Sequence, residues 1–143
     1  MAIKKSVAEG FARGELYDVV KWQDGAPYGA TFTVGAESSN AITVNIQLTD
    51  YLGNDLANPA AVIAYISSDA SGLNIAASGC SSDASIGTDG SLAVLLTKTV
   101  YLLASENDGD IDVKFTDTGT SGFYLNIILA NGRIATSPKI QFA

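Results

Sequence analysis

The stretch that decides the fold is Ile42-Thr43-Val44-Asn45-Ile46-Gln47-Leu48-Thr49. Large aliphatic residues alternate here with residues that carry hydroxyl or amide groups. Because successive side chains of a strand point to opposite faces, one face of this segment is apolar and the other is polar. The pattern predicts a β-strand with one face in a core and the other in solvent.

Similar signals recur along the chain on both sides of this stretch. Turn-forming residues separate them, including Asp108-Gly109 and Asn131-Gly132, two pairs that accept positive φ in hairpins. No amphipathic segment is long enough to favour a helix. With roughly seven to nine short strands, the sequence predicts an all-β fold, an antiparallel immunoglobulin-like β-sandwich over residues 30–143. Strand segments are expected at 30–34, 42–49, 61–67, 91–97, 100–104, 110–115, 123–129 and 133–142, with a weak edge strand within 73–90.

The strand pattern also predicts which side chains form the core. Tyr124, which follows the turn at Asp117-Thr118-Gly119, is expected to bond back to that turn, as the tyrosine corner of immunoglobulin-like sandwiches does. Asp110 and Asp112 share the opposite face of their strand and are expected to be solvated. The predicted inward residues are Ile42, Val44, Ile46, Val62, Ala64, Leu92, Val94, Val113, Phe115, Leu125 and Ile127.

Residues 1–29 differ from the rest of the chain. They mix lysine, glutamate and glycine with isolated large apolar residues, and no period persists. We interpret them as an extended N-terminal arm whose Phe11, Leu16, Tyr17 and Trp22 dock on a partner, because each large side chain contributes about 1.5–3 kcal/mol when fully buried. The alternative is an arm that folds back over an edge of its own sandwich.

The charge of the chain is unevenly distributed. The formal net charge is −7; residues 1–22 hold four basic and three acidic side chains, and residues 23–143 hold four basic and twelve acidic ones. An acidic body repels nucleic acid and anionic lipid, so neither is an expected partner. No apolar run is long enough for a membrane span, and the first residues lack the apolar run of a signal peptide.

The residues that usually carry catalysis are scarce. The chain has no histidine and a single cysteine, Cys80, so it lacks the commonest general base and cannot form an internal disulfide. The acidic residues Glu106, Asp108, Asp110 and Asp112 leave a carboxylate-pair hydrolase or a calcium loop as alternatives, but the spacing is not that of an EF-hand. We expect no enzyme activity, no cofactor and no metal.

Several motifs resemble those of immunoglobulin-like virion proteins of tailed bacteriophages. They are the run from Ile42 to Asp55 and the segments 64–72, 86–90, 105–113 and 131–132, together with the closing Ile140-Gln141-Phe142-Ala143. The resemblance implies a structural protein that decorates or cements a capsid, assembled in the host cytoplasm. Its expected partners are the major capsid protein or other virion subunits, and copies of itself. The alternative is a head-fibre, neck or tail-associated module that binds host-surface carbohydrate.

Overall fold

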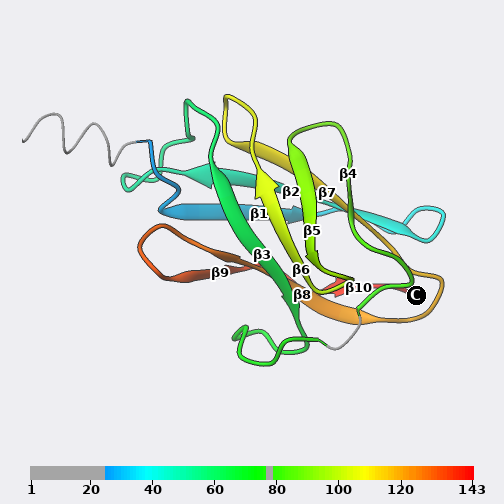
Figure 1. The fold of residues 1–143 in the computed structure, drawn as a ribbon. Coiled ribbons are helices and arrows are strands. Elements are labelled where there is room, and N and C mark those ends of the chain that lie inside the picture. The colour runs from blue at the N-terminus through cyan, green and yellow to red at the C-terminus, as the bar shows by residue number, and fades with distance from the viewer. Residues whose placement is uncertain (1–24, 77–78) are drawn as a thin grey trace, which may run out of the picture.

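The computed structural model describes residues 25–76 and 79–143, which form two antiparallel sheets packed face to face (Figure 1). No helix occurs in these residues, so the predicted all-β sandwich is confirmed. The four-stranded sheet has the order β1 (Gly29–Val34), β2 (Ala41–Thr49), β7 (Asp110–Thr116) and β4 (Ser85–Ile86). The six-stranded sheet has the order β10 (Ile140–Gln141), β8 (Gly122–Ile128), β3 (Ala61–Ser67), β6 (Val100–Ala104) and β5 (Ser91–Leu96), and β9 (Ile134–Thr136) pairs with β8.

The core lies between β2 and β7 of one sheet and β3 and β8 of the other. The aliphatic residues of β2 at positions 42, 44, 46 and 48 are at most 2% exposed, as their alternation predicts. Three aromatic rings extend this core toward one end of the sandwich. Phe123 makes an edge contact with Phe115 at 5.1 Å between centroids and a stacked contact with Phe142 at 6.3 Å.

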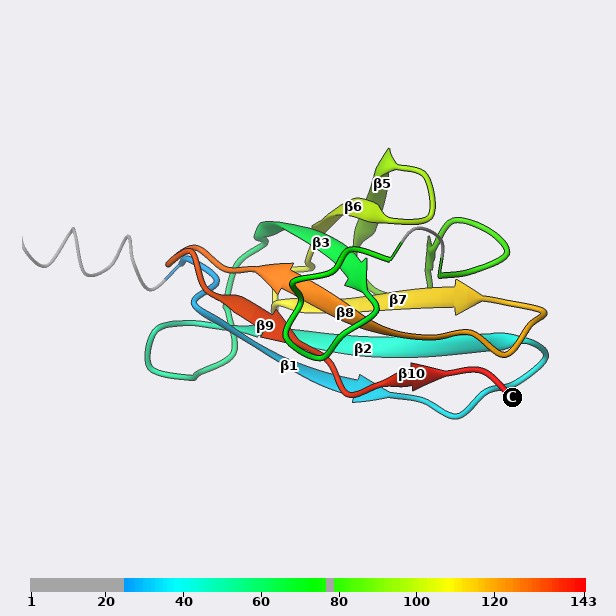
Figure 2. The same cartoon turned by 90° about the horizontal axis from the view of Figure 1, so that it is seen from below.

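Two of the predicted core positions lie at the margin of the core. Leu92 is only partly buried, although it packs against the core, and Val94 is 44% exposed, so the prediction for Val94 was wrong. Both belong to β5, which pairs only with β6 and ends the six-stranded sheet. Figure 2 shows β5 at the margin of the molecule, away from β1 and β2. The alternation of apolar and polar residues within β5 cannot reveal that the four-stranded sheet facing it is narrower than its own six-stranded sheet.

The turn that connects β6 of one sheet to β7 of the other depends on a glycine. Gly109 has φ of +81° and donates its N–H to the carbonyl of Glu106. A Cβ at Gly109 would lie 2.9 Å from the carbonyl oxygen of Leu48. The Asp108-Gly109 pair therefore forms a turn with positive φ, as predicted, and only glycine fits there. The predicted hairpin was wrong, because this turn carries the chain from one sheet to the other.

The segment 68–76 folds back over the outer face of the six-stranded sheet. The Tyr65 hydroxyl donates to the carbonyl of Gly72 at 2.7 Å, and the fully buried Asn126 side chain donates to Ser67 Oγ and accepts from Thr136 Oγ1. Gly72 has φ of +72°, and a Cβ there would collide with both side chains. A tyrosine does bond back to a turn, but it is Tyr65 rather than the predicted Tyr124, which is half-buried on β8.

The turn after β7 is held by Asp117, which is 5% exposed. Its carboxylate accepts from Ser81 Oγ at 2.6 Å and from the backbone N–H of Ser121 at 3.3 Å. Hydrogen bonds from the Ser121 and Ser81 hydroxyls lower the pKa of Asp117 to about 2. Because these donors stabilise the charged form, their hydrogen bonds to Asp117 are strongest when its carboxylate is ionised.

No helix in the described part of the chain is long and apolar enough to cross a membrane.

We expect Asp117→Asn to lower the free energy of unfolding by about 1–2 kcal/mol at neutral pH, because the amide loses charge-assisted hydrogen bonds. An unfolded aspartate has a pKa of about 3.9. Since the folded pKa is lower, the contribution of Asp117 is fully present above about pH 4 and is lost as the pH falls toward about 2. Urea unfolding across this range measures it, with the exposed Asp55→Asn as control. A difference that does not shrink in acid would contradict this assignment.

Candidate docking surface

The outer face of the six-stranded sheet carries a continuous line of exposed apolar side chains. They oppose one another in register across five adjacent strands, from β5 through β6, β3 and β8 to β9. In that order they are Ala93, Leu102, Ile63, Ile128 and Ile134, here called the apolar row. Its four large members are 38–44% exposed. Contiguous exposed apolar surface of this kind marks interaction sites.

The outer face of the four-stranded sheet has the opposite character. Its register rows are polar, such as Thr33, Asn45 and Asp112 across β1, β2 and β7. The strands of the six-stranded sheet contain no Asp, Glu, Lys or Arg at all. In the residues that the structure describes, the sandwich therefore has one polar side and one side without charge on its strands.

Part of the uncharged side is already covered by the chain itself. The segment 68–76 lies over Tyr65 and Asn126, which stand one register step from the apolar row, and both side chains are buried beneath it. The row itself lies beyond this cover. Leu73 and Ile75 of the same segment are also exposed, at 79% and 58% of their surface, and add to the apolar area.

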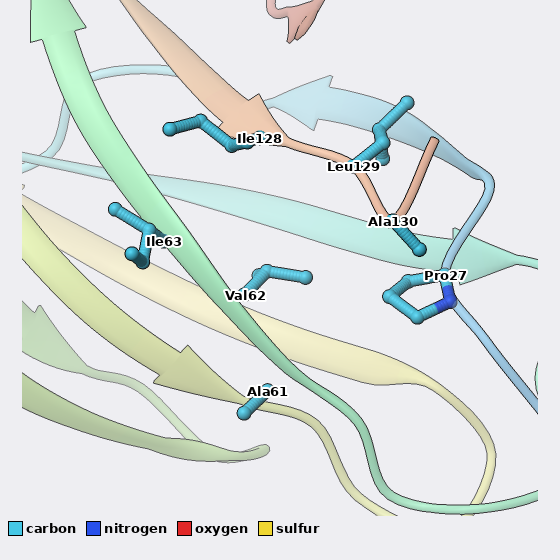
Figure 3. Close-up of a pocket in the computed structure, with 7 residues that line it drawn as sticks. All are labelled: Pro27, Ala61, Val62, Ile63, Ile128, Leu129 and Ala130. Atoms are coloured by element: carbon cyan, nitrogen blue, oxygen red, sulfur yellow. The ribbon is translucent and has the colours of Figure 1, made fainter. Parts of the chain in front are cut away.

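A hollow of about 260 Å³ opens beside Ile63 and Ile128 (Figure 3). It lies between the start of β3 and the end of β8, and Pro27 lines it together with Ala130. The backbone N–H of Ala130 donates to the carbonyl of Pro27 at 2.9 Å. Pro27 is thus fixed beside Val62 and Leu129, next to the strands that carry the apolar row, and the Ile63 and Ile128 side chains point away from it (Figure 3).

The residues predicted to dock, Phe11, Leu16, Tyr17 and Trp22, lie outside the described residues, so their role stays a prediction. The predicted boundary between arm and sandwich is close to the start of β1 at Gly29. The apolar row was not predicted. Its signal in the sequence is Ile128, an aliphatic residue at a position where Tyr124 and Asn126 lead one to expect a polar one.

The acidic cluster is less solvated than predicted. Asp112 is only 6% exposed, because Asn45 from β2 and the Thr88 hydroxyl both donate to its carboxylate. Desolvation, and then the negative charges of Asp112 and Asp89, raise the pKa of Asp110. The expectation of a solvated strand face was therefore wrong for Asp112, which is a structural hydrogen-bond acceptor. Within the described ranges, no three or more His, Cys, Asp or Glu side chains are grouped so that they could hold a metal ion.

Cys80 is buried and 8% exposed. Burial, together with the nearby carboxylate of Asp117, raises the pKa of its thiol to about 12. Because the thiolate is the reactive form, this environment suits a packing role and opposes nucleophilic chemistry.

No protein-family model matches the chain, and no curated protein matches it either.

We expect native Cys80 to react with a thiol-specific reagent far more slowly than an exposed cysteine at mildly alkaline pH, because little thiolate forms and access is blocked. Denaturant should restore full reactivity. The matched control is Ser91→Cys, at an exposed position on β5, in a Cys80→Ala background. Equal labelling rates for the two native proteins would contradict the inert assignment.

Proposed function

We propose that this protein is a structural virion protein that decorates or cements the capsid of a tailed bacteriophage, and that it is not an enzyme. The observation that carries the proposal is the apolar row. A protein that works alone in solution gains nothing from such a row, whereas a subunit that docks on a larger surface uses it to exclude water. The polar outer face of the four-stranded sheet would then face the solvent.

We also propose that the sandwich is immunoglobulin-like, and the strand order supports this. In a constant-type immunoglobulin domain, strands A, B, E and D form one sheet and C, F and G the other. Reading β1 to β4 as A to D, β7 as E, β8 as F and β9 with β10 as G gives the same neighbours. The hairpin of β5 and β6 is then an insertion between D and E that widens the second sheet beside β3.

The partners that fit are the major capsid protein or another virion subunit, and copies of this chain. The N-terminal arm supports the same proposal, because Pro27, close to the point where residues 1–24 join the sandwich, lines the hollow next to Ile63 and Ile128. Arm and row would then face the particle together, with Phe11, Leu16, Tyr17 and Trp22 as the docking side chains of the arm.

We expect Ile63→Lys to abolish stoichiometric binding of the protein to particles, because it places an uncompensated charge at the centre of the row. The control is Thr33→Lys, which adds the same charge to the exposed polar face of the other sheet. Mass spectrometry of purified particles measures the protein's copy number. Particles without the protein should also lose resistance to heat or osmotic shock.

Removal of residues 1–24 tests the arm in the same assay. The cut leaves the bonds of Pro27 and Tyr28 to the sandwich intact. On this proposal the shortened protein stays folded but leaves the particles. Particles that never contain the protein, or that bind Ile63→Lys as well as the natural chain, would refute the proposed function.

A second candidate function is carbohydrate binding by a head-fibre, neck or tail-associated module. It is favoured by Tyr51, which is 44% exposed and makes an edge contact with Tyr28 at 6.5 Å between ring centroids. Its chain neighbours Asp50 and Leu52 line a hollow of about 420 Å³, with Asn54 and Asn58 also on its wall. Aromatic faces beside amide and carboxylate groups suit a sugar, although Asp50 already accepts two backbone N–H bonds.

If this second function holds, Tyr51→Ala should abolish retention of a glycan on an array, because the ring would supply the apolar contact with the sugar. The half-buried Tyr124→Ala is the matched control. Glycan binding that survives Tyr51→Ala, or no glycan binding by the natural protein, would argue against the carbohydrate module and leave the capsid role as the proposal.

A further inference from the structure

In the free subunit, before it binds any particle, the described residues leave the apolar row exposed to water. Its four large side chains lie in line, and the strands that carry them have no charged residue. An uncovered face of this kind promotes association in water. Something is therefore expected to cover the row, and the chain itself offers a candidate.

The chain enters the sandwich beside the hollow that borders the row. The described residues begin at Gly25, and Pro27 lines the hollow that Ile63 and Ile128 also line (Figure 3). The hydrogen bond between Ala130 and Pro27 fixes this entry. Gly25 itself lies beside the loop after β2, where its carbonyl accepts from Asn58 Nδ2 at 3.4 Å. Residues 1–24 thus join the described chain two residues before the hollow next to the row.

The sequence just before this entry point is strongly apolar. In residues 16–22, the five large apolar side chains are Leu16, Tyr17, Val19, Val20 and Trp22. Five neighbouring strands span about 19 Å at a spacing of roughly 4.8 Å. An extended chain covers up to about 3.3 Å per residue, so with Trp22 at Ile63 and Ile128 the rest of residues 16–22 can reach from the middle of the row to either of its ends.

Charge favours this segment over a second copy as the cover. Residues 1–24 hold four basic and four acidic side chains, so they bring no net charge to the row. A second copy would bring a formal charge of −7 to a body that is itself acidic. The tether also gives the segment an effective concentration in the millimolar range, far above that of free subunits.

We propose that residues 16–22 of the chain cover its own apolar row in the free subunit, with Trp22 beside Ile63 and Ile128. The proposal concerns the unassembled protein and does not rest on the virion role. If the virion role also holds, docking exchanges this internal cover for the particle surface.

Trp22 is the single tryptophan of the chain, so its fluorescence reports on this segment alone. On the full-length protein, its emission should be blue-shifted and its quenching by acrylamide several-fold slower than that of the urea-unfolded chain. Ile63→Lys should shift the emission to the red and restore fast quenching. The control Leu73→Lys, at an exposed site off the row, should leave both as in the natural chain.

Circular dichroism and thermal melting check that Ile63→Lys is folded, and Ile128→Thr replaces it if it is not. Fast quenching of Trp22 in the natural protein would overturn the proposal, and so would slow quenching that neither row variant changes. Protection that disappears on dilution, with a matching loss of dimer by light scattering, would overturn it in favour of a second copy. A monomer with protected Trp22 that never appears on particles would support this inference and refute only the virion role.

Discussion

The whole domain depends on the packing of the β2–β7 pair against the β3–β8 pair. The chain has one cysteine, which is buried and free, so no internal disulfide helps to hold the two sheets together. Burial of aliphatic residues such as Val44, Ile46 and Leu125, all fully enclosed, must supply the cohesion. This packing also determines which residues of each strand face outward, because successive side chains of a strand point to opposite faces of the sheet. The two outer faces are therefore consequences of the core.

What distinguishes this protein is how differently those two outer faces are composed. On β2 the outward positions are Thr43, Asn45 and Gln47, and their cross-strand partners on β7 are charged. On β3 the corresponding positions include Ile63 and the buried Tyr65. A core needs apolar residues on inner positions only, so burial in the core does not account for the aliphatic outer positions of the six-stranded sheet. This asymmetry connects the architecture to the proposed docking role.

The sequence predicts the parts of the fold that follow from local rules. The alternation along 42–49 correctly gives β2, and Asp108-Gly109 correctly gives a turn, although it joins two sheets and not the two strands of a hairpin. The errors arise where distant segments decide. Val94 is exposed because β5 extends beyond the facing sheet, and Asp112 is buried because Thr88 covers it. The apolar row escaped prediction for the same reason, since only the register between strands aligns residues as far apart in sequence as 63 and 128.

The edge of the six-stranded sheet shows how an uncharged face constrains the rest of the molecule. Many proteins protect an edge strand with charged side chains, but β5 has none between Ser91 and Leu96. Its register shifts between Val94 and Leu96, a bulge that disrupts the regular ladder a foreign strand would need. A lysine or glutamate on the outer face of β5 would stand beside Ala93 and Leu102, at the end of the apolar row. A bulge blocks strand addition without placing charge there, so the edge is protected and the row stays suited to an apolar partner.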